Sequence, residues 1–237
     1  MTTTREDIAG LTTRIIGPAD ATLTVVLMHG FGAPGDDLVA LADPRWGISA
    51  PSTRFVFPAA PIELGGLYGD ARAWWRLDME RLEQGIRSGE VRDFLNEIPD
   101  GLAPAREQVI AFLAALKTKF DIADGRLVIG GFSQGAMIST DVALHAGAKL
   151  AGLILMSGTL IAEKIWQPKM HTLAGLPIIQ SHGKQDMLLP FAVADTLRER
   201  LIAAGAKHEW HPFTGGHEIP PPVLKAIDSF VKTRAAA

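Results

Sequence analysis

The 237-residue chain contains no cysteine. This absence excludes a disulfide framework, a zinc site built on thiolates and a cysteine nucleophile. The chain also has no run of about 18 apolar residues that could span a membrane, and its polar first residues lack the apolar core of a signal peptide. The sequence therefore predicts a cytoplasmic protein without stable membrane insertion.

The pattern of charged residues argues against several other functions. The formal net charge is −3, and no cluster of lysine and arginine with interleaved aromatic residues indicates nucleic-acid binding. Histidine, aspartate and glutamate are not grouped at metal-ligand spacing, and no G-x-x-x-x-G-K segment is present to hold phosphates. We expect a small molecule as the binding partner, with no metal and no cofactor. A homodimer is one of the oligomeric states that the sequence leaves open.

The chain is long enough for one large α/β domain, and 47% of its residues are hydrophobic. Apolar runs rich in β-branched residues alternate with segments of helical periodicity, which is typical of a mostly parallel sheet with helices on both faces. We expect strands at residues 22–29, 54–57, 127–129, 152–156, 177–181 and 208–213. Helices are expected at residues 36–41, 104–120, 136–146, 191–204 and 221–232.

Residues 62–103 interrupt this alternation with glycines, prolines and paired tryptophans. The segment is much longer than the median connection of about five residues. Long connections in compact domains often form lids or binding loops, so one hypothesis is that this segment covers a site. The alternative is a surface excursion that contains short helices. In either case the sequence predicts a single domain over residues 1–237.

A G-x-S-x-G pattern occupies residues 131–135, with Ser133 at its centre. An apolar strand is predicted before it and a helix after it, and this setting is that of a nucleophile elbow. Small residues two positions before and after the serine allow the strand and the helix to approach closely. The Ser133 hydroxyl is then presented at the end of the sheet, beside the helix N-terminus.

A serine hydroxyl becomes a strong nucleophile when a base removes its proton and a third group orients that base. In this fold class the chain order is serine, acid and then histidine, on loops at the carboxyl ends of strands. Asp186 follows the predicted strand at 177–181, and His217 follows the last predicted strand after two glycines. We therefore expect Asp186 to orient His217, the general base. Alternatively, Asp186 could cap the next helix and His217 could make only a local hydrogen bond.

The loop after the first expected strand contains Phe31 between two glycines. A tetrahedral intermediate needs backbone donors for its oxyanion. The N–H groups of Phe31 and of Gln134, the residue after the nucleophile, are the expected pair. An ordinary glycine-rich turn is the alternative for the first loop. His29 begins this loop and is expected to support it.

Candidate substrate-binding residues are large and apolar. Trp74 and Trp75 are expected to alternate in orientation, one inward and one toward the cleft, where it would wall an acyl pocket. Core packing under the long segment is the alternative for both. Met187 and Leu188 directly follow the predicted acid and are candidates for apolar lining on the leaving-group side.

Taken together, these segments resemble the phospholipase/carboxylesterase family of small α/β-hydrolases, which includes acyl-protein thioesterases and bacterial carboxylesterases. The segments occur in the order and spacing of the family and span most of the chain. The resemblance rests on residues 29–32, 74–75, 131–135, 182–186, 189–190 and 216–217.

This resemblance implies an α/β-hydrolase fold and metal-free hydrolysis of esters or thioesters. It implies Ser133, Asp186 and His217 as the catalytic triad, with Phe31 and Gln134 as the oxyanion donors. We predict a carboxylesterase that cleaves esters of short to medium acyl chain through an acyl-enzyme. A thioesterase acting on acylated proteins or small acyl thiols is the enzymatic alternative. A ligand-binding relative without turnover is the non-enzymatic one.

Overall fold

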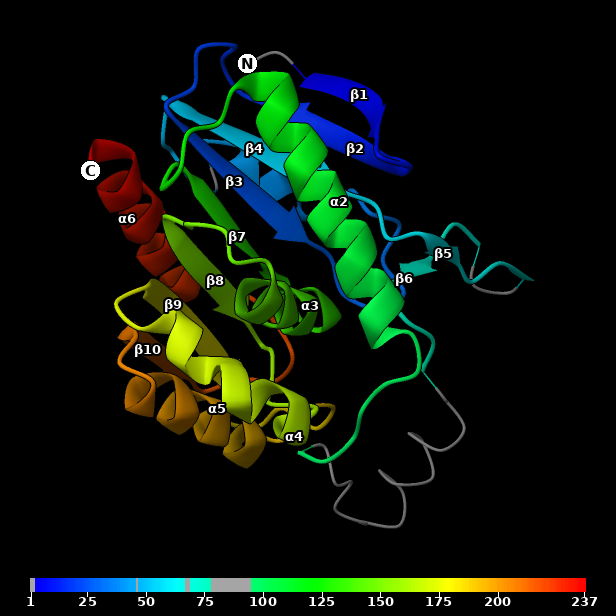
Figure 1. The fold of residues 1–237 in the computed structure, drawn as a ribbon, viewed down its shortest axis with the longest axis vertical. Coiled ribbons are helices and arrows are strands. Elements are labelled where there is room, and N and C mark those ends of the chain that lie inside the picture. Colours follow the sequence, from blue (N-terminus) through cyan, green and yellow to red (C-terminus); the bar gives the residue numbers. More distant parts are fainter. Residues whose placement is uncertain (1–2, 46, 67–68, 78–94) are drawn as a thin grey trace.

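The computed structural model describes residues 3–45, 47–66, 69–77 and 95–237. Its centre is an eight-stranded sheet with the strand order β1-β2-β4-β3-β7-β8-β9-β10 (Figure 1). The strands of this sheet are β1 (Thr3–Ile8), β2 (Leu11–Ile16), β3 (Leu23–Met28), β4 (Thr53–Pro58), β7 (Leu127–Phe132), β8 (Gly152–Met156), β9 (Pro177–Gly183) and β10 (Lys207–Phe213).

All neighbouring pairs from β4 to β10 are parallel, whereas β2 pairs antiparallel with both β1 and β4. The central strand β3 is buried at every position. Val26 and Met28 belong to the core on one face of the sheet, and Val25 and Leu27 belong to the core on the other. A continuous apolar run of this kind is what a strand covered on both faces requires.

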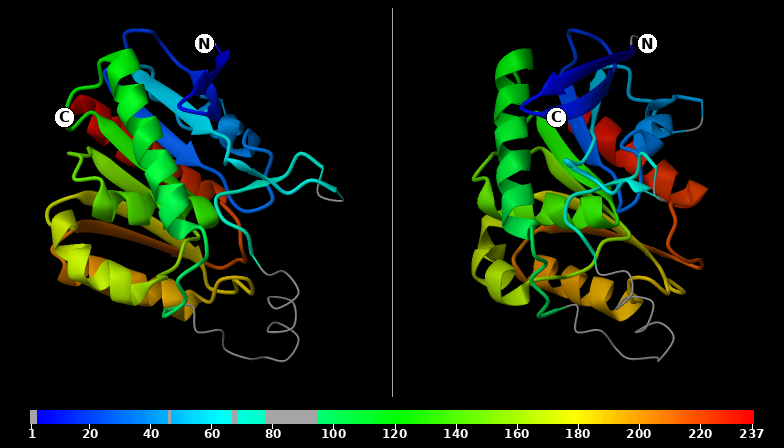
Figure 2. Two further views of the ribbon diagram at one scale, coloured as in Figure 1. Left: turned by 45° about the vertical axis from the view of Figure 1, so that its right-hand side comes forward. Right: turned by 90° about the vertical axis from the view of Figure 1, so that its right-hand side faces the viewer.

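Helices cover the two faces in separate layers (Figure 2). One layer contains α2 (Leu102–Phe120), α3 (Gln134–His145) and α5 (Phe191–Ala203), and the other contains the 3₁₀ helix η1 (Asp37–Ala42) and α6 (Pro221–Ala236). A short helical segment, α4 (Glu163–Trp166) and the 3₁₀ helix η3 (Gln167–Leu173), precedes β9. In the described residues, no helix is both long and apolar enough to cross a membrane.

The predicted fold class is confirmed: the central sheet is mostly parallel and carries helices on both faces. The hairpin of β1 and β2 and the α4–η3 segment were not predicted. Strand β1 is polar and exposes most of its side chains, because it lies at the edge of the sheet. The hairpin turns at Ala9 and Gly10, which both have positive φ, as the favoured two-residue hairpin turns require.

The long segment after β4 begins with a second, two-stranded sheet of β5 (Ile62–Glu63) and β6 (Arg72–Ala73). This pair extends away from the main sheet (Figures 1 and 2). Residues 67–68 and 78–94 lie outside the described residues, so much of the predicted lid or binding loop does as well. The chain is described again from residue 95 and enters α2 after Gly101.

The two glycines of the G-x-S-x-G pattern lie where backbones touch. A β-carbon on Gly131 or on Gly135 would overlap the carbonyl oxygen of Met28, the last residue of β3. A β-carbon on Gly135 would also overlap the carbonyl oxygen of His29. The elbow between β7 and α3 therefore packs directly on the end of β3, and these positions tolerate only glycine.

The packing at Gly135 predicts a large loss of stability for Gly135→Ala. We expect the free energy of unfolding to fall by about 3 kcal/mol or more, because the new methyl group meets backbone that cannot move aside. Gly125→Ala is the control: Gly125 has φ +75° and no neighbouring atom within 4 Å, so only backbone strain of about 1–2 kcal/mol is expected. Urea unfolding followed by circular dichroism measures the loss of stability in both variants. Equal losses would show that a β-carbon at position 135 does not overlap the end of β3.

Candidate active site

Ser133 lies between the end of β7 and the start of α3, with φ 55° and ψ −119°. Positive φ is strained for a residue with a β-carbon, and such strain persists only where the surroundings hold it. The Ser133 N–H donates to the Met156 carbonyl at 2.9 Å, and its own carbonyl accepts from the N–H groups of Ala136 and Met137. The sharp turn predicted for the nucleophile elbow is therefore present at Ser133.

Two loops bring Asp186 and His217 together at the same edge of the sheet. They follow β9 and β10, which are parallel neighbours. The Gln185 N–H donates to the carbonyl of Gly215 at 2.9 Å, and a β-carbon on Gly183 would overlap the carbonyl oxygens of Gly215 and its neighbour. The loops are thus in backbone contact, which explains the glycine at position 183.

His217 Nδ1 donates to Asp186 Oδ2 at 2.7 Å. The other carboxylate oxygen of Asp186 accepts from the N–H groups of Leu188 and Leu189, each at 2.9 Å. Burial alone would raise the pKa of Asp186, but the hydrogen bonds from His217 and from Leu189 lower it below its ordinary value. A carboxylate held in this way fixes His217 with Nδ1 protonated, which leaves Nε2 as the acceptor.

The His217 ring also packs against Phe132, with ring centroids 4.7 Å apart. Phe132 directly precedes Ser133, and both Ser133 and His217 line one cavity. The structure therefore brings the three predicted catalytic residues to the carboxyl ends of β7, β9 and β10. Asp186 is buried behind His217, whereas the serine and the imidazole face the cavity.

The loop after β3 runs beside the elbow. A β-carbon on Gly30 would lie 3.4 Å from the β-carbon of Ser133. Phe31 and Gln134 both line the cavity. Their N–H groups donate to no other residue in the described part of the chain, so both can serve a bound oxygen.

His29 supports this loop in its neutral form. Its Nδ1 donates to the Gly30 carbonyl at 2.7 Å, and its Nε2 accepts from the Ala60 N–H at 2.9 Å. The ring is buried, and burial lowers the pKa of His29 to about 4. An imidazole with one donating and one accepting nitrogen is neutral. At neutral pH, His29 therefore holds the backbone of Gly30 and Ala60 in place.

The cavity has a volume of about 280 Å³. Its polar lining includes Ser133, Gln134 and His217, and a carboxylate side chain, Glu97, also borders it. The remaining walls are largely apolar and include Trp75, Leu77, Pro99, Phe132, Met137, Ile161, Leu188 and Leu189. In the described ranges, no group of histidine, aspartate and glutamate side chains could hold a metal ion.

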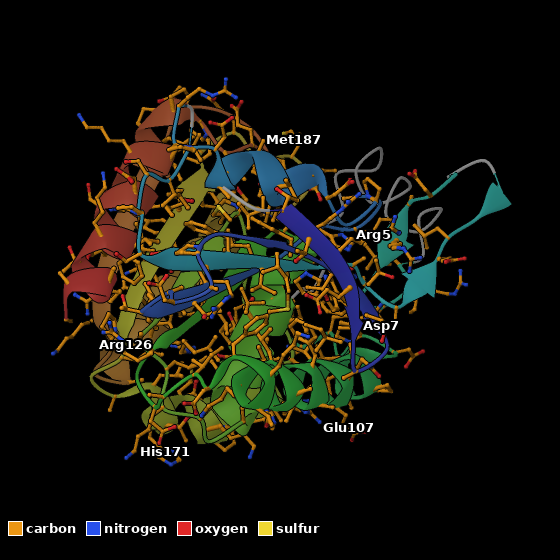
Figure 3. The ribbon with its side chains drawn as sticks, turned by 90° about the horizontal axis from the view of Figure 1, so that it is seen from above. Arg5, Asp7, Glu107, Arg126, His171 and Met187 are labelled. Carbon is orange, nitrogen blue, oxygen red and sulfur yellow. The ribbon has the colours of Figure 1, made fainter. Side chains whose placement is uncertain are left out.

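The four predicted pocket residues have different positions. Trp75 and Leu188 line the cavity, and Trp74 and Met187 do not. Trp74 is buried and donates from Nε1 to the His29 carbonyl at 3.0 Å. The side chain of Met187, labelled in Figure 3, is at the surface and 76% exposed.

Sequence reasoning missed a second histidine at the acid. His182 Nε2 lies 2.8 Å from the Leu189 carbonyl and 3.3 Å from Asp186 Oδ2. Its ring is fully buried, and burial lowers the pKa of His182. The only signal in the sequence was its place four residues before the acid. Met137 was also missed, although helical spacing puts it one turn beyond Ser133.

A serine elbow at the carboxyl end of a mostly parallel sheet, with an acid and a histidine on later loops, defines an α/β-hydrolase. A sequence model of the family described as Phospholipase/Carboxylesterase matches residues 13–235. The chain therefore belongs to the phospholipase/carboxylesterase family.

Known proteins similar to this chain agree with that assignment. Acyl-protein thioesterase 1 of Gibberella zeae is 26% identical over 220 residues, covering 89% of this chain and 90% of that protein. Acyl-protein thioesterase 1 of Schizosaccharomyces pombe is 27% identical over 235 residues, covering 95% and 97%. The crystal structure of esterase PE8 has a TM-score of 0.78 at 28% identity and covers 94% of this chain and 98% of its own. These findings place the chain among hydrolases of the esterase and thioesterase type.

The fold alone is shared more widely. The Bacillus cereus carboxylesterase has a TM-score of 0.71 at 17% identity, covering 94% of each chain.

The pKa of His29 predicts a pH-dependent contribution to stability. Its value is about 4 in the folded protein, against 6.5 for an unperturbed histidine, so the unfolded chain binds the proton more readily. The contribution is complete above about pH 6.5 and is lost progressively as the pH falls from there to about 4. Between pH 7.5 and 4.5, we expect the stability advantage of the wild type over His29→Gln to shrink by about 2–3 kcal/mol.

Urea unfolding at the two pH values measures this change. His171→Gln serves as the control, because His171 is exposed at the surface (Figure 3). A wild-type advantage over His29→Gln that is the same at both pH values would show that His29 is not held neutral by the fold.

Proposed function

We propose that this protein is a serine hydrolase that cleaves carboxylic esters of short to medium acyl chain through an acyl-enzyme intermediate. The observation that supports this proposal most strongly is the 2.7 Å hydrogen bond from His217 Nδ1 to the buried carboxylate of Asp186, at a cavity that His217 shares with Ser133. A serine with strained backbone, an oriented imidazole and an apolar cavity are the parts that acyl transfer needs.

In the first half of the reaction, Ser133 Oγ attacks the ester carbonyl carbon while His217 Nε2 takes the hydroxyl proton. The N–H groups of Phe31 and Gln134 bind the oxyanion of the tetrahedral intermediate, and Asp186 stabilises the imidazolium. The carbon–oxygen bond to the leaving alkoxide then breaks, and His217 returns the proton to it. An alcohol leaves, and the acyl group stays on Ser133.

In the second half, a water molecule takes the place of the alcohol. His217 removes a proton from the water as it attacks the acyl carbonyl, and the same two N–H groups bind the second oxyanion. Collapse of this intermediate breaks the bond to Ser133 Oγ, which regains its proton from His217. The products are a carboxylic acid and the free enzyme.

The lining and the volume of the cavity favour an apolar acyl group of limited length. Its walls are mainly hydrophobic side chains, and its volume is about 280 Å³. Burial of each methylene of the acyl chain contributes about 0.8 kcal/mol, so affinity is expected to rise with chain length until the cavity is full.

Thioester hydrolysis is the second candidate, because the curated relatives described above are named acyl-protein thioesterases. The same residues would act, with a thiol as the leaving group. Pairs of oxygen esters and thioesters with the same acyl chain distinguish the two. A kcat/KM for the thioester that exceeds that of an equally activated oxygen ester at least tenfold would favour the thioesterase.

We predict that Ser133→Ala lowers kcat on p-nitrophenyl butyrate by about 10⁴-fold or more, because no nucleophile remains. Labelling of the wild type with a fluorophosphonate probe should give a covalent adduct on Ser133. The matched control is Ser139→Ala, which removes a buried hydroxyl bonded to the Gly135 carbonyl in the same helix. Turnover retained in Ser133→Ala, or no adduct on the wild type, would overturn the proposal.

The same substitution at two adjacent tryptophans tests the acyl pocket. Trp75→Phe enlarges the cavity and breaks no described hydrogen bond, since the buried Trp75 Nε1 has no partner in the described structure. We expect the ratio of kcat/KM for the octanoate to that for the butyrate p-nitrophenyl ester to rise at least about threefold. Trp74→Phe loses the bond to the His29 carbonyl and should cost about 1–2 kcal/mol of stability.

Trp74→Phe is expected to leave the chain-length ratio unchanged, because Trp74 does not line the cavity. An identical shift in both variants would show that Trp75 does not contact the acyl chain.

A further inference from the structure

We propose that the side-chain amide of Gln134 is a positioning group that fixes the wall of the acyl pocket to the oxyanion donors. This inference rests on the proposed function. The main-chain N–H of Gln134 is one of the two proposed donors, and its side chain has a separate set of partners. Oε1 accepts from the Trp74 N–H and Nε2 donates to the Trp75 carbonyl, each at 2.9 Å.

Both of these bonds are well protected from water. Gln134 is 2% exposed, and both tryptophans are 1% exposed. A buried amide that loses its partners incurs the full cost of desolvation, so the two bonds hold strongly to one geometry. They join residues 59 and 60 positions apart in the chain. The amide therefore attaches the start of α3 to a distant segment.

Among the described residues, the attached segment has no strand pairing with the main sheet, although its tryptophans pack in the core on one face of that sheet. Trp74 and Trp75 follow β6, which pairs only with β5 among the described strands, in the separate two-stranded sheet. The Gln134 amide satisfies one N–H and one carbonyl of this segment, as a neighbouring strand would. Loss of the amide would leave both groups buried without a partner.

The same segment also holds the second oxyanion donor. The Trp74 indole donates to the His29 carbonyl at 3.0 Å. The backbone of Arg72 accepts from the Gly32 N–H at 2.9 Å and donates to the Ala33 carbonyl at 3.0 Å. Phe31 is thus held on both sides by residues 72–74. The two proposed donors lie on different elements, and residues 72–75 are hydrogen-bonded to both of these elements.

Residues 72–75 also contribute to the wall of the pocket, because Trp75 lines the cavity. An acyl chain that packs against Trp75 consequently contacts a segment bonded to both donor sites. Interactions that hold donors in the geometry of the transition state raise kcat, whereas interactions that only hold the substrate lower KM. We therefore expect loss of the Gln134 amide to appear mainly in kcat.

The chain provides a matched control for this idea. Gln180 on β9 is fully buried, donates from Nε2 to the Ala194 carbonyl at 2.9 Å and pairs through Oε1 with His208 Nε2 at 2.8 Å. It does not line the cavity. Gln134→Met and Gln180→Met each remove two side-chain hydrogen bonds, and the main-chain N–H at position 134 stays in place.

The experiment measures kcat and KM on p-nitrophenyl butyrate, the rate of fluorophosphonate labelling and the urea midpoint of both variants. We expect Gln134→Met to lower kcat by about 10–100-fold with KM changed by less than about twofold, a size typical of misplaced catalytic groups. Gln180→Met should lose comparable stability but keep kcat within about twofold of the wild type. Equal kcat values in the two variants would overturn the proposal, as would an effect of Gln134→Met on KM alone.

Gln134→Glu is the second variant and serves if Gln134→Met does not fold. It keeps the acceptor for the Trp74 N–H and places an oxygen against the Trp75 carbonyl, so an intermediate loss of kcat supports the proposal and an unchanged kcat overturns it. The proposed function fails separately: its failure would appear as a wild type that neither turns over esters nor labels at Ser133. A wild type that does both, with no specific defect at position 134, would overturn only the positioning role.

Discussion

The contact between the end of β3 and the serine elbow is the constraint on which the site depends. The Met28 carbonyl oxygen occupies the space that side chains on Gly131 and Gly135 would fill. Because the chain continues from Met28 into the loop with Phe31, this contact sets the distance between Ser133 and that loop. A bulkier residue at either glycine would push the two apart, so the proposed oxyanion donors, which lie on two elements, could no longer meet one oxygen atom.

Around this contact, the carboxylate of Asp186 is buried behind the His217 ring and does not line the cavity. Asp186 is buried with three hydrogen-bonding partners, namely two backbone N–H groups and the ring of His217, and His182 Nε2 lies 3.3 Å from it. These neighbours offset the cost of burying a carboxylate, which would otherwise raise its pKa. His29 is kept neutral by burial. In the proposed mechanism, the charge that develops during acyl transfer therefore arises next to groups that are already oriented, and little reorganisation is needed.

Much of this arrangement could be predicted from the sequence, because parallel strands end at one edge of a sheet. Once the strands before Ser133, Asp186 and His217 were recognised, the order of the loops brought these residues together. Strand β1 was missed because it is polar and exposes most of its side chains. Strand β2 is mostly buried, but Thr12, Thr13 and Arg14 interrupt its apolar residues. Alternation predicted that one of Trp74 and Trp75 faces the cleft, but the choice depends on the bond from Trp74 to the His29 carbonyl. The contacts of the Gln134 side chain link positions about 60 residues apart, and no local pattern encodes them.

The proposed catalytic residues and part of the pocket wall come from different parts of the chain, namely the main sheet and the long connection at residues 62–103. The proposed nucleophile, base and acid follow strands of the main sheet, whose packing leaves little freedom. Several pocket walls instead come from the long connection: Trp75 and Leu77 from its first part and Pro99 from its last. Trp75 also belongs to the core on one face of the sheet, and residues 72–75 are bonded to Gln134 and to the loop after β3. The hydrogen bonds and the core packing of this short segment therefore limit how far the wall of the proposed pocket can change.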